Sequence, residues 1–297
     1  MLAIIGLVVV TLGVIGGFLM EGGNLMVLLQ PGEFLIIGGA AIGAILAGTP
    51  LKVLKKMIAQ LKSTIGPGYT KKEYLELLVM MYEIFNIARR DGILALESHF
   101  NDPYKSNILS KYPVFLKNHH AVDFMSDSMK LIVMGGMDYN DLDNLMDVDL
   151  DTHHEENSKP PDALSKIGDS LPGLGIVAAV LGIVITMGAI NGPPEQIGEK
   201  VAAALVGTFL GILLSYGFVQ PVASNIEHMN TDQARYCLCI KQALISNYKG
   251  LAPALAVEFA RRSIFSDVRP TFVEVEEACR GSKLKQPEPK EKSAASA

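Results

Sequence analysis

The sequence lacks tryptophan, holds three cysteines in 297 residues, and carries no ionisable side chain in the middle of its long apolar runs. A pump or channel that works alone usually needs a carboxylate, imidazole or guanidinium near the membrane midplane to carry or select its ion. The absence of such a group argues against a self-sufficient ion pathway. If the protein handles ions, another chain supplies the charge.

Patterns typical of catalysis are also missing. The sequence contains no phosphate-binding loop, no nucleophile elbow and no glycine-rich turn between a strand and a helix. The acidic stretch at residues 138–156 lacks the glycine turn of a calcium loop, and it is interpreted as a solvated acidic helix. We therefore expect no enzyme activity, no catalytic residues, no cofactor, no bound metal and no nucleic-acid partner.

What the sequence does contain is four apolar runs of 17–21 residues, at positions 1–20, 34–50, 171–190 and 201–221. A helix of about 20 apolar residues spans the hydrocarbon core of a bilayer. A secretory signal peptide is a poor interpretation of the first run, because no basic segment precedes it and a second run follows closely. The runs predict an all-α, polytopic membrane protein with four transmembrane helices and a helical cytoplasmic domain.

The basic residues predict the orientation of these helices. Residues 51–170 hold 14 of the 26 lysines and arginines, residues 222–297 hold 11, and the short loops 21–33 and 191–199 hold none. Basic residues are retained on the cytoplasmic side. Both termini and the large loop are therefore expected on the cytoplasmic side of the membrane. The cysteines, Cys237, Cys239 and Cys279, are then expected to be reduced thiols.

These assignments divide the chain into five parts. Residues 1–50 hold the first two transmembrane helices and a short periplasmic loop, 51–170 a cytoplasmic helical loop domain, 171–221 the last two transmembrane helices and their short periplasmic loop, 222–282 a cytoplasmic C-terminal helical segment, and 283–297 a disordered tail. The tail is expected to be disordered because it has few apolar residues and is rich in lysine, proline, serine and alanine.

Small residues recur at four-residue spacing in all four runs, which favours a tightly packed bundle or oligomer. The pairs are Gly13/Gly17, Gly39/Gly43, Ala178/Gly182 and Gly207/Gly211. Glycine is also simply common in membrane helices, which is the alternative explanation.

Prolines punctuate the predicted helices. Pro172 follows Asp169 and Ser170, which predicts a helix start, because Asp or Ser can cap a helix and Pro is tolerated in its first turn. Pro221 predicts the end of the fourth helix, or a bend in it. The sharper alternative for both is a hinge between the membrane and the cytoplasmic domain. Residues 160–161, a Pro-Pro pair, predict a break after the acidic helix.

The large loop begins with a helix that has one apolar face, formed by Tyr74, Leu77, Leu78, Met81, Phe85 and Ala88. Arg89 and Glu97 follow, eight residues apart, or about 12 Å if the helix continues through Gly92. Exposed opposite charges suit a docking surface. A solvated surface without a role is the alternative.

Four local motifs carry a resemblance that extends over essentially the whole chain to about Arg280. They are GGFLMEGG at residues 16–23 with Gln30-Pro31, GDSLPGLGIVAAV at 168–180, VGTFLGILLSYGF at 206–218, and VEFARR at 257–262 followed by RPTF at 269–272. With these motifs the chain resembles the MotA family of flagellar motor stator proteins, part of the MotA/TolQ/ExbB superfamily.

The resemblance implies a mechanism. Such proteins form a pentameric ring in the lipid membrane around two copies of MotB, a single-span partner whose transmembrane Asp carries the ion. Ion flow rotates the ring against the rotor switch protein FliG. The resemblance implies rotor contact by Arg89 and Glu97, with Arg90 as a neighbouring candidate. It implies coupling through Pro172 and Pro221. It also implies an ion pathway lined by Ala179, Thr186, Thr208 and Tyr216.

The coupling ion is argued from one position. Sodium-driven relatives carry Thr where this chain has Ala179, and the loss of that oxygen favours H⁺ over Na⁺. The alternatives are a sodium-coupled stator, an ExbB/TolQ-like energiser of envelope processes, and a passive membrane scaffold. The four spans, split two and two, argue against the three-span ExbB/TolQ arrangement.

Overall fold

The computed structural model describes residues 2–63, 68–188 and 190–283, and over these ranges it contains helices and no strands. The chain forms two compact units. The first, which we call the membrane unit, combines Met1–Pro67 with His154–Thr231. The second, which we call the globular unit, combines Gly68–His153 with Asp232–Ala297. The expected disordered tail falls outside the described residues, except for Lys283.

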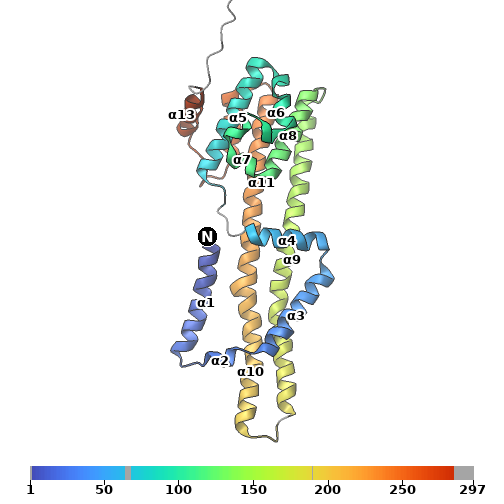
Figure 1. Ribbon diagram of the computed structural model, residues 1–297, viewed down its shortest axis with the longest axis vertical. Coiled ribbons are helices and arrows are strands. Elements are labelled where there is room, and N and C mark those ends of the chain that lie inside the picture. The colour runs from blue at the N-terminus through green and yellow to red at the C-terminus, as the bar shows by residue number, and fades with distance from the viewer. Residues whose placement is uncertain (1, 64–67, 189, 284–297) are drawn as a thin grey trace, which may run out of the picture. The chain divides into compact units, whose positions relative to one another are not determined.

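The membrane unit holds the long apolar helices (Figure 1). Its elements are α1 (Leu2–Met20), α2 (Leu25–Leu28), α3 (Pro31–Gly48), α4 (Leu51–Ser63), the later part of α9 (Tyr139–Met187), α10 (Pro194–Ile212), the π-helix η4 (Leu213–Val219) and the first part of α11 (Gln220–Tyr248). Four helical stretches in the described residues are long and apolar enough to cross a membrane. The predicted all-α fold with four spans is therefore confirmed.

The globular unit consists of shorter helices around one core. They are α5 (Lys71–Asp91), η1 (Ile93–Leu96), α6 (Glu97–Asn101), η2 (Pro103–Lys105), η3 (Leu109–Lys111), α7 (Pro113–Lys117), α8 (His119–Met134), α12 (Pro253–Ser263) and α13 (Phe272–Lys283), together with the start of α9 and the end of α11. The five-part division expected from the sequence remains a prediction.

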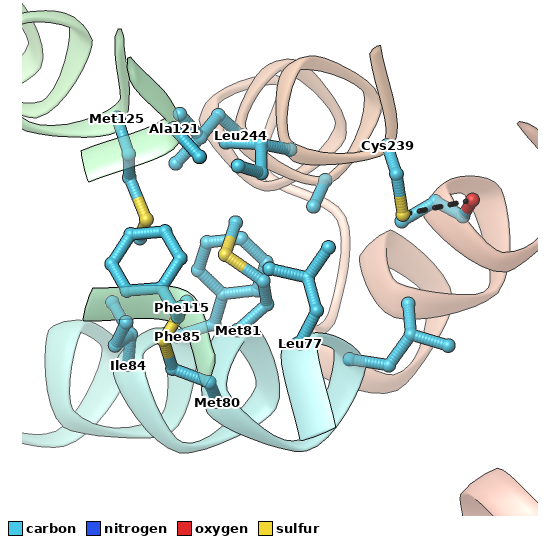
Figure 2. Close-up of a cluster of buried hydrophobic side chains, with 14 of the residues drawn as sticks. Leu77, Met80, Met81, Ile84, Phe85, Phe115, Ala121, Met125, Cys239 and Leu244 are labelled. Atoms are coloured by element: carbon cyan, nitrogen blue, oxygen red, sulfur yellow. Dashed lines mark hydrogen bonds between the residues drawn. The ribbon is translucent and has the colours of Figure 1, made fainter. Parts of the chain in front are cut away.

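Helix α5 organises the core of the globular unit. Thr70 caps it through a reciprocal pair of hydrogen bonds with Glu73, the arrangement that satisfies two backbone donors at a helix start. Its apolar face packs against α7, α8 and α11, as Leu77, Met81 and Phe85 in Figure 2 illustrate. The predicted apolar face of this helix is therefore confirmed.

The acidic stretch is helical, as expected, but part of it is not simply solvated. Lys241 of α11 is almost fully buried, and its Nζ lies 2.7 Å from Asp143 Oδ1 and 2.6 Å from Asp147 Oδ2. A buried ammonium group needs such compensation, because an unpaired charge in the interior is costly. These two carboxylates therefore hold α9 and α11 together within the globular unit.

The predicted helix break at Pro160 and Pro161 is wrong, because α9 continues through both prolines and through Pro172. A proline inside a helix leaves the carbonyl four residues earlier without its donor. Within the membrane unit, Asn230 Nδ2 donates to the carbonyl of Asn157, four residues before Pro161, over 2.7 Å. A side chain on another helix thus replaces the missing backbone bond. Pro172 likewise does not begin a helix but lies inside one.

Pro221 does not end the fourth helix either, since α10, η4 and α11 follow one another without a gap. The backbone N–H of Gln220 donates to the carbonyl of Ser215, five residues earlier, which is the π-helical spacing. Because Pro221 has no N–H and its ring crowds the preceding turn, a wider turn at this point relieves the conflict. The proline is accommodated by a change of helix type.

Helix α5, in contrast, ends at Asp91, so it does not continue through Gly92. Gly92 has a φ of +86°, a conformation that glycine adopts without the steric cost of a Cβ. The 3₁₀ helix η1 and then α6 follow it. The continuous helix on which the 12 Å spacing of Arg89 and Glu97 depended is therefore not present.

Candidate functional site

The α9–α10 contact in the membrane unit is a seam of small residues. A methyl group at Gly175 would lie 2.8 Å from the carbonyl oxygen of Gly207, and one at Gly211 would lie 2.6 Å from that of Leu171. Real side chains do not approach so closely, so these positions require glycine. The predicted pairs Ala178/Gly182 and Gly207/Gly211 thus lie where the two backbones meet.

The equivalent pairs in α1 and α3 behave differently. Space is open around Gly13, Gly17, Gly39 and Gly43, where an added Cβ would meet no atom of the described residues within 4 Å. No residue of α1 is buried within the chain. These small-residue faces are therefore available to lipid or to another protein chain.

Helix α3 packs across the α9–α10 seam and completes a three-helix cluster. Its Ile37 and Ala41 join Ala178 of α9 and Val206 and Leu210 of α10 in one buried apolar group. Small residues let helices approach closely in a membrane, where van der Waals packing drives association. This cluster fixes the part of the membrane unit in which the predicted ion-pathway residues lie.

The four predicted ion-pathway residues have different surroundings. Ala179 and Thr186 are buried, Thr208 is half-buried and Tyr216 is exposed. Thr186 Oγ1 donates to the carbonyl of Gly182 over 2.8 Å, so this hydroxyl is turned back onto its own helix. No hydrogen bond joins the four side chains in the described part of the chain. Within a single chain these four residues do not enclose a site. They are positions that could line one side of an ion pathway.

Two buried polar groups near this seam were not predicted from the sequence. Ser215 lies inside the π-helix with a fully buried side chain, and its Oγ has no hydrogen-bond partner among the described residues. Glu33 is only 8% exposed, and its Oε2 is also without a partner in the described chain. The sequence places Glu33 in a short acidic loop, but Pro31 already opens α3, so the carboxylate belongs to a helix.

A signal for Glu33 was available in the sequence. Proline is favoured in the first turn of a helix, where its missing N–H costs nothing. Pro31 therefore indicates a helix that starts before the apolar run at residue 34. Only the packing of that helix onto α9 and α10 could reveal that the carboxylate is buried.

The predicted rotor-contact residues lie on the surface of the globular unit. Arg89, Arg90 and Glu97 are all exposed. Arg90 makes two hydrogen bonds to Asp91, 3.0 Å from Nε to Oδ1 and 2.7 Å from Nη2 to Oδ2. These hydrogen bonds lower the pKa of the Asp91 carboxyl below its ordinary value. Arg90 is thus engaged by a neighbour, whereas no ion pair of Arg89 or Glu97 occurs in the described residues.

A cavity of about 440 Å³ lies beside Arg89 in the globular unit. Its lining includes Phe85, Leu96 and Met129, with Asn247 and Tyr248 of α11. Tyr248 Oη donates to the carbonyl of Met137 over 2.6 Å, which holds this wall in place. Arg89 therefore stands at the edge of a hollow with apolar walls rather than on a flat surface.

The VEFARR and RPTF segments stabilise the fold around α12 and α13. Arg261 donates through Nε and Nη2 to the Glu258 carboxylate, at 2.6 and 2.7 Å, and through Nη1 to the carbonyl of Pro270 at 3.0 Å. Hydrogen bonds from Arg261 and then Arg262 lower the pKa of the Glu258 carboxyl. The charged side chains Glu258, Arg261 and Arg262 of this motif thus pair with one another within the globular unit.

No group of three or more potential metal ligands occurs among the described residues. The cysteines are free and buried. Burial raises the pKa of the Cys237 and Cys239 thiols to about 12, so neither is a reactive thiolate at neutral pH.

Comparisons with known proteins agree on one family. Residues 4–92 match the family described as Motility protein A N-terminal, and residues 117–238 match the MotA/TolQ/ExbB proton channel family. The chain is 40% identical to Motility protein A of Escherichia coli over 287 residues, covering 96% of this chain and 97% of that protein. It is also 40% identical to Motility protein A of Salmonella typhimurium over 281 residues, covering 94% and 95% of the two chains.

Solved structures show the same fold. The structure of Campylobacter jejuni MotAB matches with a TM-score of 0.76 at 23% identity, covering 91% of this chain and 98% of that one. The flagellar MotAB stator complex from Bacillus subtilis matches with a TM-score of 0.69 at 21% identity, covering 95% and 98%.

Proposed function

The chain belongs to the MotA family, and from this premise we propose that it is the ion-conducting stator subunit of a bacterial flagellar motor, which converts ion flux into torque on the rotor. The observation that carries the proposal is the α9–α10 seam. It has the close glycine packing of a membrane bundle, but the apolar runs 171–190 and 201–221 contribute no carboxylate, imidazole, ammonium or guanidinium group.

The missing charge indicates a second subunit. We propose MotB as that subunit, with its transmembrane Asp beside α9 and α10 as the proton carrier. The two solved relatives are titled as MotAB complexes, which supports a partner of this kind. The uncovered faces of α1 and α3 are consistent with a homo-oligomer, and we propose the pentameric ring implied by the family, embedded in the lipid of the inner membrane.

We propose H⁺ as the coupling ion. Ala179 has no side-chain oxygen, and the Thr186 hydroxyl is already hydrogen-bonded to Gly182 of its own helix. A metal cation is held by several oxygen ligands, and these walls offer few. A proton needs only the carrier carboxylate. Sodium coupling, the alternative, is disfavoured by the same observation.

We further propose that Arg89 and Glu97 contact the rotor protein FliG, with Arg90 in a secondary position. Arg90 is held by Asp91, whereas Arg89 is exposed beside the cavity and available to a partner's carboxylate. Complementary charges at an interface mainly set specificity and association rate. Both termini and the globular unit are accordingly proposed to face the cytoplasm.

The direct test is complementation. In a motile bacterium that lacks its own stator genes, co-expression of this chain with its cognate MotB should restore swimming, and either chain alone should not. Restoration of outer-membrane uptake or of envelope integrity, without swimming, would instead support the ExbB/TolQ-like alternative.

Two sets of variants test the residue roles in the same strain. Pro172→Ala or Pro221→Ala should leave membrane insertion intact and abolish swimming if the prolines couple ion flow to the rotor. Arg89→Glu should reduce torque and be partly rescued by a charge-reversed FliG residue. Normal swimming of both proline variants, or no rescue by any rotor charge, would contradict these roles.

A further inference from the structure

Glu33 is a buried carboxylate inside a part of the chain that is otherwise built of apolar and small residues. It lies in the first turn of α3, is 8% exposed, and has an Oε2 atom without a hydrogen-bond partner among the described residues. Burying a polar group without compensation is costly, and burying an unpaired charge is more so. Such a group is retained where it has a function or an absent partner.

The α9–α10 seam provides the space for this side chain. A methyl group at Gly207 would overlap Glu33 Oε2, and one at Gly182 would lie 3.6 Å from Oε1. The carboxylate therefore occupies a notch made by one glycine on each helix. The two helices meet beside it, where Ala204 of α10 packs against Gly182.

The usual structural roles of a first-turn glutamate do not account for its burial. In a capping box Glu33 would accept the backbone N–H of Gln30, but that N–H donates to the carbonyl of Leu28. Glu33 forms no ion pair with any described residue. Its favourable interaction with the positive end of the helix dipole is also available to an exposed carboxylate, so it does not require burial.

The charged groups around Glu33 are few. Neither α2 nor the α9 stretch from Leu171 to Met187 has a titratable residue. In α10 the candidates are Glu195, Glu199 and Lys200. Lys200 is half-buried and stands four residues before Ala204, so by helical spacing it shares the face of α10 that meets the notch.

The position of the notch matches the proposed route of the ion. Gly207 is six residues into the fourth apolar run, which is about 9 Å from its start. In the proposed topology this start faces the periplasm, where the driving protons enter. Thr208, one of the proposed wall positions, is the next residue along α10.

We propose that Glu33 is a second proton-binding site, contributed by this chain itself, which takes up protons on the periplasmic side of the α9–α10 seam and passes them toward the partner's carrier carboxylate. This inference rests on the proposed stator function. Hydronium transfers its proton to Oε2, leaving water and a neutral carboxyl group. Transfer of that proton to the next water or carboxylate regenerates the Glu33 carboxylate, and no electrons change hands.

The notch favours a proton over a metal cation. Its side-chain oxygens are those of one carboxylate, and the surrounding positions are glycines and alanines. Metal cations of the hard type take six or more oxygen ligands. A single carboxyl that alternates between the neutral and the charged form is suited to a proton alone, and Lys200 lies on the side where it can stabilise the charged form.

The test uses the full chain with its partner in the stator-deficient strain. Glu33→Gln keeps the size and polarity of the side chain but cannot exchange a proton. We expect this variant to assemble with the partner and to lower motor speed at low load roughly tenfold, less than the ~100-fold or more that a proton-transferring group contributes, because the partner's carboxylate still carries the proton. We also expect the dependence of speed on external pH to flatten. Glu33→Asp should retain a pH dependence with a shifted midpoint.

The matched control is Glu21→Gln, which removes an exposed acidic residue from the turn that follows α1. It should leave both speed and pH dependence unchanged. Unaltered speed and pH profile in Glu33→Gln, with normal amounts of complex, would overturn the proposal. The proposal would also be overturned, in favour of a packing role, if Glu33→Gln and Glu33→Asp lowered motor speed equally and lowered the amount of assembled complex to the same extent.

Two further outcomes remain decisive. If the Glu33→Gln chain does not accumulate in the membrane, the test depends on Glu33→Asp alone. A shifted midpoint in the dependence of motor speed on external pH supports proton exchange by residue 33, and an unshifted midpoint overturns the proposal. If the unmodified chain with its partner fails to restore swimming, the proposed stator function is wrong, which is distinguishable from a defect confined to Glu33 variants.

Discussion

The two units of the chain bury their apolar residues in different ways. The globular unit closes one core, in which residues such as Leu77, Leu78 and Met81 are fully buried. In the membrane unit no described residue of α1 is buried, and the buried apolar residues form two small clusters, one where α3, α9 and α10 meet and one around Leu164, Ala223 and Ile226. The globular unit buries its apolar residues within the chain, whereas the membrane unit leaves apolar faces available to lipid or to other chains.

The difference also appears in the residues that hold each unit together. Large side chains fill the globular core, where buried area drives folding. Glycine and alanine dominate the membrane seam, where lipid is as apolar as the protein and close backbone contact matters more. A substitution that adds volume should therefore harm the membrane unit most, and one that removes volume should harm the globular unit most.

The largest expected effect is that of Gly211→Val. The added side chain would meet the carbonyl oxygen of Leu171 and the backbone of Gly175, neither of which can move without separating α9 from α10. We expect loss of the assembled membrane complex and of swimming. The control is Gly198→Ala in the same helix, where space is open. If the complex of the Gly211→Val chain purified in normal yield, the close contact of α9 and α10 at Gly211 would be contradicted.

Removal of volume from the globular unit comes next. Phe85→Ala, in the core shown in Figure 2, should lower the free energy of unfolding by about 3–5 kcal/mol, the usual range for a buried aromatic residue. Leu255→Ala, at an exposed position, should have a small effect. Chemical denaturation followed by circular dichroism measures both. Equal effects of the two variants would show that the core is not closed as described.

A smaller effect is expected in the membrane unit from Asn230→Ala. The variant removes the donor to the Asn157 carbonyl and also the acceptor for Gln60 Nε2, 3.1 Å away. Leaving a buried carbonyl unpaired costs about 1–3 kcal/mol. The midpoint of thermal unfolding in detergent should fall, and Asn225→Ala in the same helix should lower it less. An unchanged midpoint would mean that water replaces the Asn230 side chain.

The smallest effect concerns the α13 helix of the globular unit. Hydrogen bonds from Lys71 and Thr271 lower the pKa of the Glu274 carboxyl from about 4.5 to about 2. Because the folded value is depressed, this contribution to stability is present above pH 4.5 and is lost as the pH falls toward 2. Glu274→Gln should remove that difference, which NMR titration of the carboxyl carbon and acid unfolding can follow. An ordinary carboxyl titration in the unmodified chain would contradict it.

The sequence predicted the parts of this fold that depend on local pattern. Apolar runs of sufficient length became the membrane helices, and the periodic face of Leu77, Met81 and Phe85 became the globular core. Both follow from spacing along one segment, which the sequence displays directly. The small-residue pairs of α9 and α10 also lie where their spacing suggested.

The errors arose where a distant residue decides the outcome. A helix passes Pro161 because Asn230, far along the chain, supplies the missing donor to Asn157. Glu33 is buried because α3 meets glycines of two other helices. Neither partner can be identified from the local sequence, since proline ordinarily ends a helix and glutamate ordinarily faces water.

The π-helix η4 has a consequence for the direction in which side chains point. A π-helical turn accommodates one residue more than an α-helical turn. Each residue of an α-helix rotates the chain by about 100° around the helix axis. The positions before and after Leu213–Val219 are therefore out of phase with a continuous α-helix. Thr208, ahead of this segment, and the start of α11, beyond it, share one rod but follow two separate angular registers. Formation or loss of the π-helical turn would therefore rotate one end of this continuous helix relative to the other about the helix axis.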